Sequence, residues 1–342
     1  MPVFRGLPRL TTVFPTVFSI GLEMLIRLGT RQSPLALWQA EYVKSELMNL
    51  GHQVELVKIT TSGDVSITPL GQSGGQGVFT KEIQRALLEN RCDLAVHSLK
   101  DLPTEVIPEL RLSAVPPRED ASDCLISGGQ ALADLPAGTI VGTGSPRRKA
   151  QLLHLRPDLI ISDIRGNVDT RLRKLDEGQY GAILLAYAGL HRLGLASRIS
   201  EKLTFTQMLP AVGQAALGLE TRADDEQTIL AISALDHPAT HAAVIAERGL
   251  LRSMRAGCLA PLAAHTSITE HSIQIEARVF SMDGQEMIAT QQQLPIHPSS
   301  DPKSSDYSAL FLLAEKLGEA AAMDLTDKGA GLLIDRSRKP ST

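Results

Sequence analysis

Residues 139–186 read TIVGTGSPRRKAQLLHLRPDLIISDIRGNVDTRLRKLDEGQYGAILLA, and their pattern predicts the fold class. Three short apolar runs, each bounded by Gly, Pro or Asp, predict buried strands. These runs cover residues 139–142, 158–162 and 181–186. Helices are predicted between them, one near 146–155 and one that follows Asp169, because polar residues separate the apolar ones there. Strands that alternate with helices predict an α/β unit with a largely parallel or mixed sheet.

The same alternation fills the N-terminal part of the chain, where three further strands are predicted. They are LIRLG at 25–29, VELVKI at 54–59 and DLAVH at 93–97. Ser33 and Pro34 predict the start of a helix, since Ser caps an N-terminus and Pro is tolerated in the first turn. Gly51 predicts the end of that helix. A second helix is predicted over 81–90, after a Gly-, Ser- and Thr-rich loop at 60–78 whose length favours a functional role.

The C-terminal third has a different pattern, in which an amphipathic helix at 240–256 precedes a strand at 273–280 and a helix at 307–322. This order predicts a small α+β unit. Segments at 116–122 and 209–217 indicate crossings between domains. The predicted division is therefore a first α/β domain at 25–116 and 212–236, a second α/β domain at 117–211, and an α+β domain at 237–335.

Residues 1–24 differ from the rest of the chain, since they contain two arginines and no acidic residue before Glu23. Pro8 and Pro15 interrupt any apolar centre that a targeting segment would need. We expect either a disordered extension or sequence that precedes the true start at Met24. Deletion of residues 1–23 should therefore leave activity and melting temperature nearly unchanged.

The composition argues against several classes of protein. With 342 residues, of which 43% are hydrophobic and 21% charged, the chain has the make-up of a soluble globular protein of two or three domains. It has no run of about 18 apolar residues, so neither a transmembrane helix nor a membrane partner is predicted. A net charge of −4 and 4% aromatic residues argue against a nucleic-acid binder. Three cysteines predict a reducing, cytoplasmic compartment rather than a disulfide framework.

Basic residues gather where predicted strands end. Residues 144–174 contain eight Arg or Lys against three Asp. Ligands of open α/β sheets bind at the carboxyl ends of the strands, where helix N-termini add N–H donors. We expect an anion-binding cleft that uses Arg147, Arg148, Arg165 and Arg171, because a guanidinium can bind both oxygens of a carboxylate. A solvated helix face is the alternative interpretation of this cluster.

Two more strand exits carry polar residues. The motif HSLKD contains Lys100 and Asp101, and the motif GTRQSP contains Arg31 and Ser33. A loop ion pair would explain either motif alone. Polar residues follow the carboxyl ends of predicted strands in both motifs and in the basic cluster at 144–174. Because these positions are topologically equivalent, they favour a single cleft.

The three cysteines have different surroundings. Cys258, in the motif AGCLAP, lies between small residues near Arg252 and Arg255, which favours an accessible and reactive thiol. Cys92 and Cys124 border apolar strands and are expected to be inert. The chain has neither CxxC nor HExxH spacing, so no metal is predicted.

Motifs throughout residues 25–335 occur in the order found in the porphobilinogen deaminase (hydroxymethylbilane synthase) family, which the chain resembles. They are TRQSPLALWQA, GVFTKEIQRALLENRCDLAVHSLKDLPT, IVGTGSPRRKAQLL, IRGNVDTRL, LAYAGLHRLGL, LPAVGQAALGLE and AGC. The resemblance implies two similar doubly wound α/β domains of periplasmic-binding-protein type II architecture and a small α+β C-terminal domain. It also implies a monomeric transferase that joins four porphobilinogen molecules head to tail, with loss of ammonia, into hydroxymethylbilane.

The resemblance further implies a dipyrromethane cofactor held by Cys258 as a thioether, and Asp101 as the catalytic carboxylate. The family positions that bind the cofactor correspond to Arg31, Ser33, Lys100, Ser145, Arg147, Arg148, Arg165 and Arg171. The positions that contact the substrate or the growing chain correspond to Arg31, Phe79, Arg165, Arg171 and Arg192. Asp64 and Asp163 are competing carboxylates at predicted cleft edges.

The chain departs from the family in the loop before Phe79, where Gln72 and Gln76 replace lysines and Ser62 replaces a basic residue. This loop therefore contributes less positive charge toward the cofactor. Two alternatives from other classes are a non-catalytic two-lobe anion-binding protein and an Arg-rich nucleic-acid binder. A bound dipyrrole would exclude the first, and the acidic net charge argues against the second.

Overall fold

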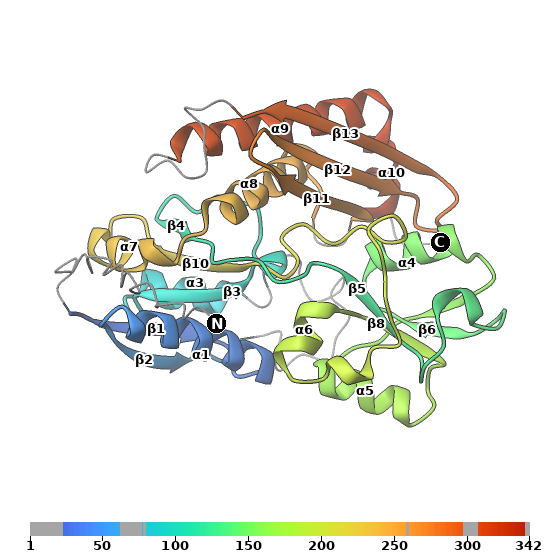
Figure 1. The fold of residues 1–342 in the computed structure, drawn as a ribbon, viewed down its shortest axis with the longest axis horizontal. Helices are drawn as coiled ribbons and strands as arrows, with labels where there is room; N and C mark the ends of the chain where they lie inside the picture. The colour runs from blue at the N-terminus through green and yellow to red at the C-terminus, as the bar shows by residue number, and fades with distance from the viewer. Residues whose placement is uncertain (1–22, 62–76, 78–79, 258–259, 297–306, 339–342) are drawn as a thin grey trace, which may run out of the picture.

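The computed structural model describes residues 23–61, 77, 80–257, 260–296 and 307–338, which form two five-stranded sheets and one three-stranded sheet. In Figure 1 the first sheet (blue and cyan) and the second (green) lie side by side. The C-terminal unit (orange and red) lies above both of them in this view.

The first sheet has the strand order β2-β1-β3-β10-β4. Its strands are β1 (Leu25–Thr30), β2 (Gln53–Lys58), β3 (Leu94–Ser98), β4 (Leu110–Ala114) and β10 (Leu217–Arg222). Strand β1 pairs parallel with β2 and β3, whereas β10 pairs antiparallel with β3 and β4. The helices of this unit are α1 (Pro34–Asn49), α3 (Lys81–Leu88) and α7 (Glu226–Ile232). Apolar Ile26, Leu28 and Leu94 of the strands share one core with Val43 and Leu47 of α1.

The second sheet has the order β7-β6-β8-β5-β9, and its fourth strand is again antiparallel to both neighbours. Its strands are β5 (Asp123–Ile126), β6 (Ile140–Gly142), β7 (Ile160–Ser162), β8 (Ala182–Ala186) and β9 (Glu201–Lys202). Its helices are α4 (Pro146–Leu155), α5 (Val168–Asp176) and α6 (Tyr187–Arg192). The two larger units are therefore alike in topology. Single 3-10 turns are η1 (Leu99–Asp101), η2 (Leu132–Asp134), η3 (Ala196–Arg198) and η4 (Ser233–Leu235).

The C-terminal unit is an antiparallel sheet covered by helices. Its strands are β11 (Leu262–Ile268), β12 (Ser272–Phe280) and β13 (Met287–Pro295), and its helices are α8 (Pro238–Ser253), α9 (Ser308–Asp327) and α10 (Ala330–Arg338). Leu250 of α8, Ile275 of β12 and Leu317 of α9 are fully buried in one core. This is the small α+β unit that the sequence predicts.

The predicted fold class is confirmed, and most predicted elements are present. The helix predicted at 146–155 is α4, and the Ser33 hydroxyl caps α1 by accepting a hydrogen bond from the Ala36 N–H at 3.4 Å. Helix α9 extends to Asp327, beyond its predicted end, because its buried apolar face continues to Leu325. Strands β4, β5, β9 and β10 were not predicted, and of the three strands in the C-terminal sheet only β12 was predicted with bounds.

The chain crosses between the two larger sheets twice, after β4 and before β10, and α8 contacts both crossings. Glu247 of α8 is fully buried and accepts hydrogen bonds from Nη1 of Arg118 and from the N–H of Gly213, each at 2.7 Å. It also accepts from the N–H of Thr266 in β11 at 3.0 Å. One carboxylate thus joins both crossings to the C-terminal unit. The residue boundaries of the domains stay a prediction.

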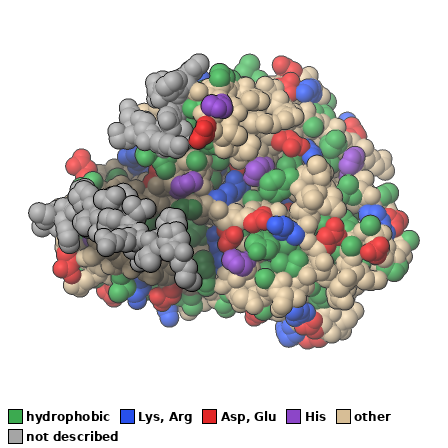
Figure 2. All heavy atoms as spheres, viewed as in Figure 1, with side chains coloured by type: hydrophobic (Ala, Val, Ile, Leu, Met, Phe, Trp, Pro, Cys, Tyr) green, Lys and Arg blue, Asp and Glu red, His purple; other side chains and the backbone are tan. Residues whose placement is uncertain are grey.

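Among the described residues no single helix combines the length and apolar character needed to cross a membrane. The helix pair 226–235 and 238–253 meets that test only when taken together, and it is bent by 109°. On the face drawn in Figure 2, Lys and Arg side chains (blue) are interspersed with Asp and Glu side chains (red).

Candidate active site

A cavity of about 260 Å³ lies between the two larger sheets. Its wall comes from the ends of β1 and β3 on one side and from α4, α5 and α6 on the other. Seven of the predicted site residues line it, namely Arg31, Ser33, Lys100, Asp101, Arg148, Arg171 and Arg192. Polar residues that follow the strand ends in all three predicted segments therefore line one cavity.

Local structure directs the residues of the first sheet toward the cavity. Strand β1 ends at Thr30, whose buried hydroxyl donates to the carbonyl of Ala36 at 3.1 Å and so fixes the turn that carries Arg31. After β3 the chain enters the single turn η1 at once, which brings Lys100 and Asp101 to the cavity wall. Two adjacent residues of opposite charge thus occupy the end of one buried strand.

The second sheet contributes helix termini and cations. Helix α4 begins directly after β6, and the Ser145 hydroxyl caps it by accepting from the N–H of Arg148 at 3.4 Å. Arg192, the last residue of α6, donates from Nη2 to the carbonyl of Ala215 at 2.6 Å. Its guanidinium also lies 5.5 Å from the ring centre of Trp38 in α1, within the range of a cation–π contact. Arg192 therefore bridges the two larger units at the cavity.

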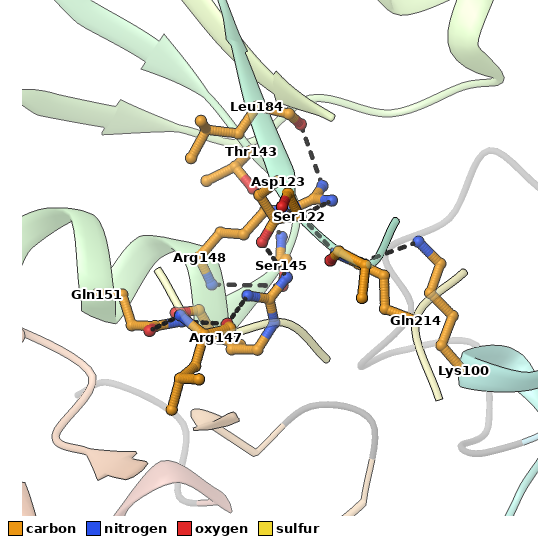
Figure 3. Close-up of polar contacts among 12 residues, drawn as sticks. Lys100, Ser122, Asp123, Thr143, Ser145, Arg147, Arg148, Gln151, Leu184 and Gln214 are labelled. Atoms are coloured by element: carbon orange, nitrogen blue, oxygen red, sulfur yellow. Dashed lines mark hydrogen bonds and ion pairs between the residues drawn. The ribbon is translucent and has the colours of Figure 1, made fainter. Parts of the chain in front are cut away.

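A buried carboxylate organises the arginines behind the cavity wall (Figure 3). Oδ1 of Asp123 accepts from Nε and Nη2 of Arg148 at 3.0 and 2.7 Å, and Oδ2 lies 2.8 Å from Nη2 of Arg147. Arg148 also donates to the carbonyl of Leu184 at 3.1 Å, and Arg147 to that of Leu209 at 2.5 Å. Burial alone would raise the pKa of Asp123, but Arg147 and Arg148 outweigh burial and hold that pKa well below its usual range.

Burial dominates the pKa values of three cations that line the cavity, Lys100, Arg171 and Arg192. Burial, and then repulsion by Arg148, lowers the pKa of Lys100 to about 8. Burial is also the main cause that lowers the pKa of Arg171 to about 10 and the pKa of Arg192 below its ordinary value. Bound carboxylates would raise these pKa values again, because a nearby opposite charge favours the charged form. The electrostatics of the cavity thus suit an anionic ligand.

Three of the predicted site residues do not line the cavity. Arg147 is 4% exposed and its charge is paired with Asp123, while Ser145 acts as a helix cap. Arg165 is paired with Asp163 at 2.8 Å, from Nε to Oδ2. The sequence predictions that lie outside the described residues concern Ser62, Asp64, Gln72, Gln76, Phe79 and Cys258.

Two residues that the sequence predictions missed are Asp123 and Gln214, which are 0% and 1% exposed. Asp123 stands directly before the apolar run CLI, and an acid in that position can be buried only if it is paired. That signal could have found Asp123. Gln214 lies within the motif LPAVGQAALGLE, but the motif does not indicate which of its residues reaches the site.

The other cysteines are unsuited to covalent chemistry. Cys92 and Cys124 are fully buried, and burial is the main cause that raises their pKa to about 11 and about 12. Both thiols are therefore protonated near neutral pH. Across the residues that the structure describes, no three His, Cys, Asp or Glu side chains gather as metal ligands would.

The fold and the cavity define an α/β protein with a cationic site between two similar units, suited to a small molecule that carries several carboxylates. The family model described as porphobilinogen deaminase, dipyromethane cofactor binding domain, matches residues 26–230. The model described as porphobilinogen deaminase, C-terminal domain, matches residues 241–304. The chain belongs to the porphobilinogen deaminase family.

Membership gives the reaction and the cofactor. The chain is a transferase that polymerises porphobilinogen into hydroxymethylbilane, and it uses a dipyrromethane cofactor. The prediction of an enzyme of this family is thus confirmed.

Two solved structures illustrate a distant similarity to other proteins. The aliphatic sulphonate binding protein SsuA from Escherichia coli is 14% identical, with a TM-score of 0.37 over 68% of this chain and 70% of that one. The lipoprotein Tp32 from Treponema pallidum is 13% identical, with a TM-score of 0.39 over 62% of this chain and 90% of that one. Similarity at this level says nothing about ligands.

The residues at the cavity fit a dipyrromethane. Two porphobilinogen units carry four carboxylates, and the five basic residues of the cavity wall can pair with them. These are Arg31, Lys100, Arg148, Arg171 and Arg192.

Proposed function

We propose that porphobilinogen units are joined in the cavity between the two larger sheets, with Asp101 as the catalytic carboxylate and Cys258 as the cofactor attachment site. The observation that supports this most is the juxtaposition of Asp101 with five basic side chains on one cavity wall. An acid among cations can act on the reacting centre while the cations hold the carboxylates around it.

Asp101 has three tasks in this proposal. It delivers a proton to the departing amine or places a charge beside it, it stabilises the substrate cation left when ammonia departs, and it accepts the pyrrole α-proton after coupling. The arginines cannot move protons, because they stay protonated. When bound, the dipyrromethane supplies the free pyrrole α-carbon to which the first substrate is joined.

The basic and hydroxyl side chains divide the remaining work. In the proposal, the carboxylates of the cofactor are bound by Arg31, Ser33, Lys100, Ser145, Arg147, Arg148, Arg165 and Arg171. The substrate and the growing chain contact Arg31, Phe79, Arg165, Arg171 and Arg192. Arg147 and Arg165 would have to share their guanidinium groups with Asp123 and Asp163. Arg147 is therefore expected to act mainly through the position of Arg148.

The substitution Asp101→Asn tests the role of this carboxylate, because it keeps the size and removes the charge. We expect the cofactor to remain attached while turnover falls about 10²-fold or more. Asp169→Asn is the matched control, since Asp169 lines the same cavity without an assigned role. Turnover near the wild-type rate in a loaded Asp101→Asn variant would exclude Asp101 and make Asp64 the next candidate.

Intact mass spectrometry tests the attachment site. Cys258→Ser should abolish both activity and the mass increment of two pyrrole units, and the buried Cys92→Ser should retain the increment. Retention of the increment in Cys258→Ser would contradict the proposal.

The setting of the enzyme is also proposed. We propose that the enzyme is a cytoplasmic monomer whose partner is porphobilinogen and which binds neither nucleic acid nor membrane. The small number of cysteines and the mixed surface charge support this setting. Light scattering of the purified protein tests the monomer. A salt-dependent shift on labelled DNA would contradict the absence of nucleic-acid binding.

A further inference from the structure

Gln214 lies in the crossing that leads into β10, and its side chain reaches between the two larger units (Figure 3). Its Nε2 donates to the carbonyl of Ala121 at 2.7 Å and to Oδ1 of Asp123 at 2.9 Å. Its Oε1 accepts from Nζ of Lys100 at 3.5 Å, a long hydrogen bond. A single amide therefore connects the buried carboxylate behind the wall to an ammonium that lines the cavity.

The partners of this amide permit only one orientation. The carboxylate of Asp123 and the carbonyl of Ala121 can only accept hydrogen bonds, so the NH₂ end must face them. The amide oxygen then faces Lys100, whose ammonium can only donate. A flipped amide would set acceptor against acceptor and donor against donor.

The backbone of Gln214 is held as firmly as its side chain. Its carbonyl accepts from Nε of Arg118 at 2.7 Å, and the preceding Gly213 donates to Glu247 at 2.7 Å. Gly213 has a φ of +67° and Ala215 a φ of +71°, so the turn uses the left-handed region on both sides of Gln214. Such backbone persists only where surrounding contacts over-determine it, and it clusters at functional sites.

We propose that Gln214 is a positioning residue of the reaction, which holds the ammonium of Lys100 at the cavity wall through an amide whose orientation Asp123 sets. The inference rests on the proposed function, in which Lys100 binds carboxylates. A charged ammonium attracts a carboxylate and a neutral amine does not. Gln214 therefore controls how well Lys100 can bind anions, without contact to the reacting atoms.

Several charged groups act on Lys100 besides this amide. Burial lowers its pKa most, followed by repulsion from Arg148 and, more weakly, Arg147, whereas Asp101 and Asp123 raise it. Other charged residues that line cavities next to Lys100 are Arg31, Asp169, Arg171, Arg192 and Arg248. With a pKa of about 8, the charge of Lys100 responds to any change in its hydrogen bonds near neutral pH.

The test compares Gln214→Met with Gln151→Met in the cofactor-loaded enzyme. Met keeps the volume and removes the amide. Gln151 is the control, because it is also 1% exposed and does not line the cavity. Its amide bonds the N–H and carbonyl of Leu209 and, at 3.4 Å, the backbone carbonyl of Arg147, but not Lys100 or Asp123. The readout is the pH titration of the ¹³C-labelled Lys100 side chain by NMR, assigned with Lys100→Arg.

Loss of the amide oxygen should lower the Lys100 pKa by about 0.5–1 unit in Gln214→Met, because the charged form loses an acceptor. Wild type and Gln151→Met should titrate alike. Gln214→Leu, which also removes the amide, should shift the titration in the same direction, and it serves if Gln214→Met does not fold. An unchanged titration in either folded Gln214 variant, or an equal shift in Gln151→Met, overturns the proposal.

A double-mutant cycle links the contact to cofactor binding. We expect the rate at which the apoprotein acquires the dipyrromethane, measured as the mass increment of two pyrrole units, to fall several-fold in Gln214→Met, and Gln214→Met to add little in a Lys100→Met background. Additive effects would show that Gln214 does not act through Lys100 and would overturn the proposal. An unchanged rate of cofactor acquisition in Lys100→Met would instead refute the proposed role of Lys100, while the NMR titration still decides the contact.

Discussion

Asp123 is a single residue on which the geometry of several cations depends. It is fully buried, and its two oxygens contact two arginines and one amide. Burial of such an ion pair costs several kcal/mol per charge, which the mutual attraction must offset. Removal of one charged partner lowers the free energy of unfolding more than replacement of the whole cluster by apolar residues would. The reason is that the remaining charges stay buried without a partner.

Asp123→Asn is therefore expected to destabilise the protein by about 3–5 kcal/mol, since Arg147 and Arg148 lose their counter-charge. Urea unfolding measures the change. Asp176→Asn is the control, because Asp176 forms an exposed pair with Arg198 and should change stability by less than about 1 kcal/mol. Equal effects of the two substitutions would contradict the importance of the buried carboxylate.

The difference in the free energy of unfolding between wild type and Asp123→Asn should decrease at acidic pH. The pKa of Asp123 is depressed in the folded state, so its stabilisation is complete above the unfolded pKa of about 4 and is lost as pH falls below it. The stability gap between wild type and Asp123→Asn should thus be constant from about pH 8 to 5 and narrow below about pH 4. A gap that narrows toward alkaline pH would argue against this origin.

At the residue scale, sequence predicted where the cations gather but not which of them face the ligand. Arg147 and Arg148 are adjacent in the motif SPRRK, yet only Arg148 lines the cavity. Both arginines pair with Asp123, which lies at the start of β5, and the fold turns only Arg148 toward the cavity. A partner of this kind becomes visible only in the tertiary structure.

At the element scale, strand β10 shows why some elements escaped prediction. Its sequence LGLETR contains Gly218 and Glu220, which both argue against a central strand. Gly218 is needed because a Cβ there would lie 2.5 Å from Leu99. Glu220 is tolerated because it is hydrogen-bonded to His97 at 2.9 Å and Gln84 at 3.0 Å. By contrast, α1 and α4 have caps within their own sequence and were predicted well.

The packing of α8 against α9 gives a prediction for one position. A Cβ at Gly318 would collide with the backbone carbonyl of Ala246 and lie 3.0 Å from the backbone N of Leu250. Backbone cannot move aside, so Gly318→Ala should destabilise the fold by about 1–3 kcal/mol. Gly331→Ala in α10 meets nothing within 4 Å and should be neutral or stabilising by up to about 1 kcal/mol. Thermal unfolding distinguishes the two, and similar effects would refute the close contact.

At the scale of the whole molecule, a chain with net charge −4 holds a cavity with five basic residues. The cavity attracts an anionic substrate electrostatically, although the net charge of the chain is negative. Such attraction weakens with ionic strength, although less for buried charges than for exposed ones.

We therefore expect the KM for porphobilinogen to rise several-fold between about 0.05 and 0.5 M NaCl, with kcat nearly constant. Initial rates measure both values, and sucrose at matched viscosity is the control. A constant KM, with an unchanged melting temperature, would contradict an electrostatic contribution to substrate binding.

The position of β10 between β3 and β4 also governs the order of events during synthesis. Leu217 pairs with Ser98, so β3 emerges from the ribosome 119 residues before its partner. At about 5–20 residues per second this interval lasts roughly 6–24 s. During this time the second sheet, whose strands all lie between Asp123 and Lys202, is complete in the nascent chain. The unit in the middle of the chain can therefore fold first, while the edge of β3 that pairs with β10 stays unpaired until the ribosome delivers β10.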